Sequence, residues 1–450
     1  MVVEDLCERT LALLGGRAEA VVTASAGTAA LTRFANGRIH QNVSEDTVAV
    51  RLTVDLDGRV ARAATTRTGD DDLAALVGRA LAAAALRPAD PDVAGFAPAA
   101  PVTAVDHWDD ATAAATPDDR AAVVADFIAA GDAGTAGAAG DAGTAGAAGF
   151  CSTRARRRAL AATTGQRAVT RSTMAQVDGI HRVGTSDGFA QATAAGLGAV
   201  DGGACGSRAA GKARAGVDPV EMAPGHYEVV LEPRAVAAVL LFPAYAGFNG
   251  KAHADGTSFV HLGEEQWDRA VDIWDDATDP RALGDPYDVE GTPKRRVDLV
   301  RAGTSVGLAH DRRSAALAGV EPTGHSVGSE AFGGYPTDLF LGAGDSSPGD
   351  LVAAVERGLL VTDLWYNRIL DPKTQVVTGL TRNGLFLIED GRVTGPVQNM
   401  RYTQSVVGAF GPGRVRGLGD DAQLVGGEGN VMHVPSVRLA SWSFTGNARG

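Results

Sequence analysis

Hydrophobic and polar positions near the start of the chain follow two different periods. Between residues 46 and 54 apolar side chains alternate with polar ones, which is typical of a half-buried strand, and Asp57-Gly58 then supplies a tight hairpin turn. Apolar residues in 71–86 recur at helical spacing until Pro88 stops the pattern. The pattern therefore predicts a first α/β module at 1–87, with a helix ending at Gly15-Gly16, strands at Thr32–Gln41 and Asp46–Ala64, and a helix at 71–86.

The middle of the chain begins with a stretch rich in Pro, Ala and Asp at 88–115, which we interpret as a linker. Thr116-Pro-Asp-Asp119 is a strong helix start, with a capping hydroxyl, a proline in the first turn and acids facing the helix dipole. That helix is expected to reach about residue 130. Strands at 168–176 and 188–194 complete a middle α/β module at 116–220.

A perfect duplication interrupts this middle module. Nine residues from Asp132 to Gly140 are repeated from Asp141 to Gly149. A unit so rich in Gly and Ala cannot bury enough surface to order itself. We therefore predict a flexible loop at 131–149 without a chemical role.

From residue 221 to 450 the pattern is mostly that of strands. Hairpins are expected around Ala302-Gly303 and Asp390-Gly391, and an apolar helix follows the strand at His226–Leu231. Two further helices are expected at 311–317 and 348–357. The predicted fold class is α+β, with an α/β N-terminal region of helices on a sheet and a β-rich C-terminal domain.

Composition restricts the environment and the partners. The formal net charge of −13 opposes binding to nucleic acid, since phosphate contacts depend on Lys and Arg. The apolar stretch Ala235–Phe248 is too short to span a bilayer and contains Pro243, so no membrane segment is expected. Three cysteines without close spacing, and an N-terminus whose acids precede any apolar run, favour a cytoplasmic location without a signal peptide.

Several blocks of sequence, in a fixed order over about residues 20 to 440, resemble one known family. They are Thr32-Arg-Phe-Ala-Asn-Gly-Arg-Ile-His-Gln41, Gly256-Thr-Ser-Phe259, Asp288-Val-Glu-Gly-Thr-Pro293, Pro322-Thr-Gly-His325, Gly358-Leu-Leu-Val361 and Asp371-Pro-Lys-Thr-Gln-Val-Val-Thr-Gly-Leu-Thr-Arg-Asn-Gly384. Together these blocks resemble the TldD/PmbA family of zinc peptidases, also described as modulators of DNA gyrase. The resemblance implies an α/β N-terminal region and a β-rich C-terminal domain.

The chain departs from the family pattern where the metal would bind. One kind of family subunit carries a His-Glu-x-x-x-His helix and a Cys near the C-terminus. Here Leu231–Gly247 contains no His, Cys or Asp, its single Glu is Glu232, and Val425–Asn430 contains no Cys. Zinc requires imidazole, thiolate or carboxylate donors. The resemblance therefore implies a metal-free subunit of the PmbA (TldE) kind, with zinc in a partner.

Other candidate sites are weaker. His253, His261 and Glu264 are the nearest approach to a metal cluster, but the histidines are not at helical ligand spacing. We keep His253, His261 and His325 as candidate substrate or partner contacts. Gly206–Lys212 lacks the hydroxyl of a P-loop and is read as a linker, within or beside a second linker at 213–225.

Two serines stand in patterns like that of a serine hydrolase. Gly324-His-Ser-Val-Gly328 spells a nucleophile elbow around Ser326, and Gly303-Thr-Ser-Val-Gly307 spells a looser version around Ser305. The prolines and glycines around Ser326 leave neither the strand nor the helix of an elbow, and Ser305 falls in an expected hairpin. We therefore read both patterns as loop and hairpin sequence.

The sequence is compatible with three functional hypotheses. The leading one is a subunit without catalytic residues that pairs with a zinc-bearing, TldD-like subunit in a heterodimeric protease for unfolded peptides. The second is a self-contained, homodimeric peptide-binding or scaffold protein. The third is a serine hydrolase that uses Ser326.

Overall fold

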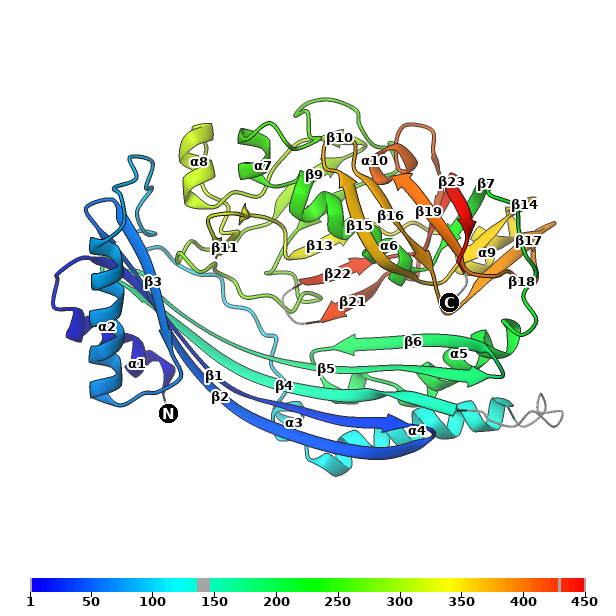
Figure 1. Ribbon diagram of the computed structural model, residues 1–450, viewed down its shortest axis with the longest axis horizontal. Coiled ribbons are helices and arrows are strands. Elements are labelled where there is room, and N and C mark those ends of the chain that lie inside the picture. The colour runs from blue at the N-terminus through cyan, green and yellow to red at the C-terminus, as the bar shows by residue number, and fades with distance from the viewer. Residues whose placement is uncertain (1, 136–145, 428–429, 449–450) are drawn as a thin grey trace.

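A long, curved sheet forms the base of the molecule, and a strand-rich C-terminal region lies on its concave side (Figure 1). The structure, a computed structural model, describes residues 2–135, 146–427 and 430–448. The α+β class predicted from the sequence is confirmed, with helices on an antiparallel N-terminal sheet and a strand-rich C-terminal part. Over these residues, no helix combines the length and the apolar character needed to cross a bilayer.

Six antiparallel strands make the N-terminal sheet, in the order β3-β2-β1-β4-β5-β6. They are β1 (Glu19–Ala35), β2 (Arg38–Leu56), β3 (Arg59–Thr65), β4 (Gly146–Ala162), β5 (Arg167–Val183) and β6 (Ser186–Ala194). Because β1 pairs with both β2 and β4, the sheet runs across the two modules that the sequence pattern separates. Pairing between strands far apart in sequence leaves no local periodic signal, so the pattern could not show this continuity.

The predicted strand Thr32–Gln41 is confirmed except at its centre, because it comprises the end of β1 and the start of β2 with a tight turn at Asn36-Gly37 between them. Asn36 and Gly37 have φ values of 51° and 67°. This is the left-handed geometry of a type I′ hairpin, for which Asn-Gly is a preferred pair. The predicted turn at Asp57-Gly58 is confirmed, with φ values of 53° and 79° between β2 and β3.

Two pairs of helices cover the N-terminal sheet. Helices α1 (Val3–Leu14) and α2 (Asp70–Ala85) pack at one end, and α4 (Pro117–Thr135) and α5 (Gly202–Ala215) pack at the other. The predicted start of α4 is confirmed, since Thr116 and Asp119 exchange hydrogen bonds across the first turn. Short α3 (Asp110–Ala113) and the 3₁₀ helix η1 (Leu197–Ala199) also contact β5.

The predicted loop at 131–149 is wrong at both ends. Helix α4 continues to Thr135, and β4 already begins at Gly146. The central residues 136–145 of the duplication lie outside the described residues. Neighbouring elements thus extend into the duplication from both sides.

The predicted linker at Gly206–Lys212 is also wrong, because these residues form the centre of α5. Asp201 caps this helix by accepting a hydrogen bond from the Ala204 amide at 2.8 Å. A Cβ atom at position 206 would lie 2.1 Å from the carbonyl oxygen of Phe127 in α4. Glycine is therefore used in α5 for close helix packing, which overrides its low helix propensity.

The C-terminal region contains two large sheets and a small hairpin. One sheet has the order β10-β9-β8-β13-β22-β21, and a nine-stranded sheet has the order β15-β16-β19-β23-β7-β14-β17-β18, with β20 also pairing with β23. The strands are β7 (Gly225–Leu231), β8 (Ile273–Asp275), β9 (Val297–Arg301), β10 (Thr304–Ser305), β11 (Ser326–Ser329), β12 (Gly333–Gly334), β13 (Asp338–Leu341), β14 (Arg357–Val361), β15 (Leu364–Asp371), β16 (Val376–Thr381), β17 (Leu385–Glu389), β18 (Arg392–Pro396), β19 (Met400–Ser405), β20 (Val415–Leu418), β21 (Gln423–Gly427), β22 (Asn430–Val434) and β23 (Val437–Asn447).

Local sequence signals succeed for the turns and short helices of this region. The hairpins at Ala302-Gly303 and Asp390-Gly391 are confirmed, with positive φ at all four residues. The predicted helices at 311–317 and 348–357 correspond to α8 (Arg312–Ala318) and α9 (Pro348–Ala353), the second shorter than expected. The other helices are α6 (Pro233–Phe242), the π-helical turn η2 (Pro243–Gly247), α7 (Gly250–Ala254) and α10 (Val406–Ala409).

The largest hydrophobic core lies between these two C-terminal sheets and includes α6. Ala235, Val236, Val239 and Leu240 of α6 are each no more than 1% exposed. They pack with residues of both sheets, such as Ile273 of β8, in one contiguous cluster. Burying each large side chain of this kind stabilises the fold by about 1.5–3 kcal/mol, so α6 is a central structural element.

We predict that the substitution Gly206→Val lowers the free energy of unfolding by about 2–3 kcal/mol, because its side chain overlaps the backbone of α4. Gly211→Ala in the same helix is the control. A Cβ atom there meets no atom within 4 Å, so this variant should gain about 0.5–1 kcal/mol. Chemical denaturation of the two variants measures both effects, and equal stability of the two would contradict the packing argument.

Candidate functional site

A cavity of about 540 Å³ lies beside α6, where the two C-terminal sheets approach strand β6. The side chains that form most of its wall are apolar: Ala237, Ala238, Leu241 and Phe242 of α6, Leu364, Val425 and Met432. A concave apolar pocket with a few polar groups at its edge is the usual form of a ligand site. The helix predicted to have lost its metal ligands thus forms one wall of the cavity.

Arg234, in the first turn of α6, is a charged residue at the edge of this cavity, and its guanidinium contacts three other side chains. Its Nε donates to Asp363 Oδ1 at 3.0 Å, and its Nη1 donates to Gln191 Oε1 at 2.8 Å. Its guanidinium carbon also lies 4.0 Å from the ring centre of Phe189. Since Gln191 and Phe189 belong to β6, Arg234 joins the N-terminal sheet to the cavity.

Two carboxylates share the positive charge of Arg234. Burial raises the pKa of Asp178 to about 6, although Arg234 opposes that change. Burial likewise raises the pKa of Asp363, against the attraction of Arg234. A carboxylate that already faces a guanidinium is a poor ligand for a metal cation, because the guanidinium repels the cation.

Aromatic side chains from β15 form the exposed rim of the cavity. Trp365 is 45% exposed and Tyr366 is 65% exposed. Tyr366 has a φ of 56° at an irregularity in the pairing of β15 with β16. For a bulky residue this conformation costs about 1–3 kcal/mol, and such strain is concentrated at ligand sites. No pattern in the sequence indicated this rim, because an irregularity in strand pairing depends on the partner strand.

The predicted ligand positions between Leu241 and Gly247 hold apolar or small residues. Leu241 faces the cavity, whereas Pro243, Ala244 and Gly247 are buried. A Cβ atom on Gly247 would lie 2.0 Å from the ring of Phe259. The segment from Leu241 to Gly247 itself therefore offers no imidazole, thiolate or carboxylate donor.

The weak metal candidates do not converge on the cavity. His253 lies in α7, and His261 and Glu264 lie in a loop; all three are exposed, and none lines the cavity beside α6. Over residues 2–135, 146–427 and 430–448, no three His, Cys, Asp or Glu side chains are grouped to hold a metal ion. The roles proposed for His253 and His261 as substrate or partner contacts stay predictions.

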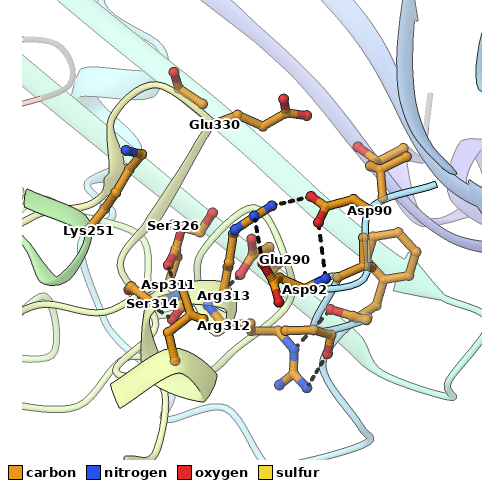
Figure 2. A pocket seen from close by; sticks show the side chains of 18 of the residues that line it. Asp90, Asp92, Lys251, Glu290, Asp311, Arg312, Arg313, Ser314, Ser326 and Glu330 are labelled. Atoms are coloured by element: carbon orange, nitrogen blue, oxygen red, sulfur yellow. Dashed lines mark hydrogen bonds and ion pairs between the residues drawn. The ribbon is translucent and has the colours of Figure 1, made fainter. Parts of the chain in front are cut away.

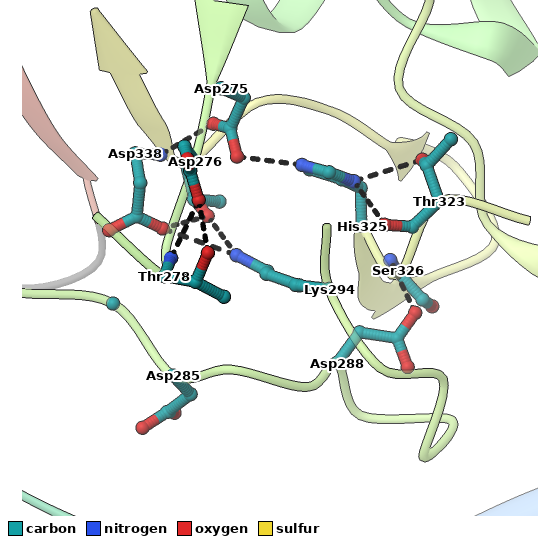
Figure 3. Close-up of polar contacts among 12 residues, drawn as sticks. Asp275, Asp276, Thr278, Asp285, Asp288, Lys294, Thr323, His325, Ser326 and Asp338 are labelled. Carbon is teal, nitrogen blue, oxygen red and sulfur yellow. Dashed lines mark hydrogen bonds and ion pairs between the residues drawn. The ribbon is translucent and has the colours of Figure 1, made fainter. Parts of the chain in front are cut away.

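His325 lies in a buried polar network rather than at a surface (Figure 3). Its side chain is fully buried, with Nε2 2.7 Å from Asp275 Oδ1 and Nδ1 2.9 Å from Thr323 Oγ1. In the same network, Lys294 Nζ pairs with Asp338 Oδ2 at 3.2 Å. The predicted contact of His325 with a substrate or partner does not fit this position, because the ring is enclosed by the protein.

Ser326 lacks the surroundings of a catalytic nucleophile. It begins the short strand β11, and no helix follows within the hairpin. Its amide donates to Asp288 Oδ2 at 3.0 Å, and its hydroxyl interacts with Glu290. The adjacent His325 is directed to Asp275. The geometry is therefore not that of a serine hydrolase, as the proline and glycine pattern indicated.

A second cavity, of about 390 Å³, lies between the N-terminal sheet and α8 (Figure 2). Arg312 donates to the carbonyl oxygens of Gly95 and Ala94 at 3.0 and 3.2 Å, and its amide donates to Glu290 Oε2 at 3.1 Å. Arg313 forms an ion pair with Asp90. These contacts join the segment after α2 to the C-terminal region, so this cavity lies at the interface between the two parts of the fold.

The carboxyl group of Glu290, at this interface, has a strongly raised pKa. Burial, together with the negative charge of Asp288, raises the pKa of Glu290 from 4.5 to about 8. The folded protein therefore retains a proton that the unfolded chain releases above pH 4.5. By linkage, the stabilising contribution of Glu290 is complete below that pH and is lost as the pH rises toward 8.

We predict that the Glu290→Gln variant loses this pH dependence. Relative to wild type, its unfolding free energy should increase between pH 5 and pH 9, by at most about 1.4 kcal/mol per pH unit. Urea unfolding across that range measures the difference. Glu330→Gln is the control, since this carboxylate lines the same cavity but is exposed. Parallel curves for wild type and Glu290→Gln would rule out the assigned protonation.

Comparison with solved structures places this fold among known ones. TldE from Thermococcus kodakarensis is 17% identical, with a TM-score of 0.86 over 98% of this chain and 99% of that chain. A candidate modulator of DNA gyrase from Thermotoga maritima is 18% identical, with a TM-score of 0.83 over 99% and 100%. Another from Bacteroides thetaiotaomicron is 18% identical, with a TM-score of 0.82 over 98% of each chain. At this identity the likeness concerns the fold.

Family models match two separate parts of the sequence. Residues 224–446 match the PmbA/TldA metallopeptidase C-terminal domain, and residues 20–84 match PmbA/TldA metallopeptidase domain 1. The first match contains α6 and both C-terminal sheets, and the second contains β1 to β3. With the architecture described above, these matches show that the chain belongs to the TldD/PmbA family of metallopeptidase-like proteins.

Proposed function

We propose that this chain is the metal-free subunit of a TldD/PmbA-type peptidase assembly. In this assembly it holds unfolded peptide while a zinc-bearing, TldD-like partner cleaves it. One observation carries the proposal: α6 lies within the part of the chain that matches the family, but apart from Arg234 the side chains that it presents to the cavity are alkyl or aromatic. The peptidase chemistry is therefore assigned to the partner.

The chemistry of the cavity supports binding rather than hydrolysis. Its wall is apolar, and its charged pair, Arg234 and Asp363, is neutralised internally. Activation of water for peptide cleavage requires a metal or a general base with a free lone pair. An apolar cavity instead favours the burial of apolar side chains, which unfolded peptides expose and folded proteins enclose.

The position of β15 supports an extended ligand. β15 is the outer strand of the nine-stranded sheet and contributes to the rim of the cavity. Its outer edge presents backbone groups to which an extended peptide can add as a further strand. A peptide bound along this edge would place its side chains next to the cavity beside α6.

We expect the isolated chain to bind no stoichiometric zinc and to show no peptidase activity. When it is co-expressed with the His-Glu-x-x-x-His sibling from the same organism, the two should co-purify and cleave unfolded casein in a chelator-sensitive reaction. Metal analysis and a casein assay, on each chain and on the complex, measure these properties. Stoichiometric zinc in the isolated chain would overturn the assignment. A stable homodimer that does not bind the sibling would favour a self-contained binding protein.

The variant Ala238→Trp tests the cavity within the assembled complex. An indole at this half-buried position fills the cavity, so we expect kcat/KM for peptide to fall about tenfold while the complex still forms. Ala82→Trp on the exposed face of α2 is the matched control and should retain full activity. Unchanged activity of the Ala238→Trp complex would show that peptide does not use this cavity.

A further inference from the structure

The rim of the cavity beside α6 combines aromatic rings with unpaired positive charge. The guanidinium carbon of Arg368 lies 4.6 Å from the ring centre of Tyr366, and that of Arg382 lies 4.8 Å from the ring centre of Trp365. In the described part of the chain, neither guanidinium forms an ion pair with a carboxylate. Arg368 Nη1 also donates to the carbonyl oxygen of Asn367 at 2.8 Å. Stacking on a ring holds each guanidinium in place, and a guanidinium has five N–H donors, so Arg368 retains donors for another acceptor.

The charge of this rim contrasts with the charge of the whole chain. The protein carries a net charge of −13, yet the described charged residues that line this cavity are Arg234, Asp363 and Arg368. The first two neutralise each other as an ion pair. Among the described residues that line the cavity, Arg368 is therefore the charged side chain without an oppositely charged partner, and it lies at the mouth. Such a site is complementary to a ligand with an apolar body and an adjacent anionic group.

The geometry of an extended peptide restricts which anionic group of the ligand can lie at the mouth of the cavity, next to the bound apolar side chain. Side chains of a strand alternate between opposite faces, so the residue after one bound in the cavity points away from the surface. An acidic side chain at that next position therefore faces solvent. The main-chain carboxylate of the bound residue itself is close to its own Cβ atom and remains at the mouth of the cavity, where Arg368 lies.

We propose that this cavity binds the C-terminal residue of a peptide, with a bulky apolar side chain against α6 and the free carboxylate on Arg368. Arg382 contributes a second positive charge beyond Trp365, and the preceding residues of the peptide lie along the free edge of β15. This inference deepens the proposed function by naming the ligand of the same cavity. It concerns the isolated chain and does not require the partner for its test.

The test measures binding of N-terminally fluorescein-labelled hexapeptides to the isolated chain by fluorescence anisotropy. A peptide that ends in Phe with a free carboxylate should bind about tenfold more tightly than its C-terminal amide, the effect of one charge-assisted hydrogen bond. A free-acid peptide that ends in Ala should also bind more weakly, because it leaves the cavity unfilled. Equal binding of acid and amide, or no binding of either, would overturn the proposal.

Substitution of single arginines identifies the side chain of this protein that binds the C-terminal carboxylate of the peptide. Arg368→Gln should weaken binding of the free acid to the level of the amide and leave the amide unchanged. Arg392→Gln, an exposed arginine on β18 at the opposite edge of the same sheet, is the matched control and should bind like wild type. Arg382→Gln is a second variant that should weaken the free acid to a smaller extent. Thermal unfolding verifies that each variant is folded.

A further peptide distinguishes a C-terminal carboxylate from an acidic side chain. It carries Phe followed by Asp and ends in an amide. Binding as tight as that of the free acid would show that the site recognises an acidic side chain, and it would overturn the assignment to the C-terminus. If the chain binds the free acid but fails to pair with a zinc subunit, the proposed function fails and this inference stands.

Discussion

The burial of α6 inside the C-terminal core is the constraint on which the rest of the structure depends. Side chains of α6 are enclosed by both C-terminal sheets, so the helix must be apolar over most of its surface. A metal centre in such a place would need charged or imidazole ligands with partners of their own, since unpaired buried polar groups are costly. In this chain residues 240–244, at the end of α6 and the start of η2, are Leu, Leu, Phe, Pro and Ala, and the cavity next to α6 has a mostly apolar wall.

Buried charges join the N-terminal sheet to the C-terminal region and set their relative position. Arg156 and Arg158 of β4 both pair with Asp285, at 2.9 and 2.6 Å. Although burial raises the pKa of Asp285, the two guanidiniums more than offset this effect and hold it below its ordinary value. Breaking such a pair leaves an uncompensated charge in the interior, so these contacts define one orientation. That orientation places β6 where Arg234 of α6 can reach it.

Some sites were visible in the sequence, and others were not. The absence of ligands on the apolar helix could be read directly, because donor atoms belong to residue types. The rim around Tyr366 could not be read, because its positive φ arises from a register shift against β16. The buried position of His325, a candidate substrate or partner contact in the sequence, could not be read either, because its partner Asp275 is distant along the chain. The raised pKa of Glu290 likewise could not be read from the sequence, because its surroundings come from three separate segments.

The sequence by itself determined the α+β class, the turns at Asp57-Gly58, Ala302-Gly303 and Asp390-Gly391, the capped start of α4, and the family resemblance of the quoted blocks. Each of these depends on residue type and on neighbours a few positions away. Tertiary structure alone decided that β1 pairs with β4, that a glycine-rich segment becomes a helix against α4, and that Trp365 of β15 and Leu241 of α6 meet at one cavity. These outcomes depend on contacts between segments far apart in the chain, where burial and packing outweigh local preference.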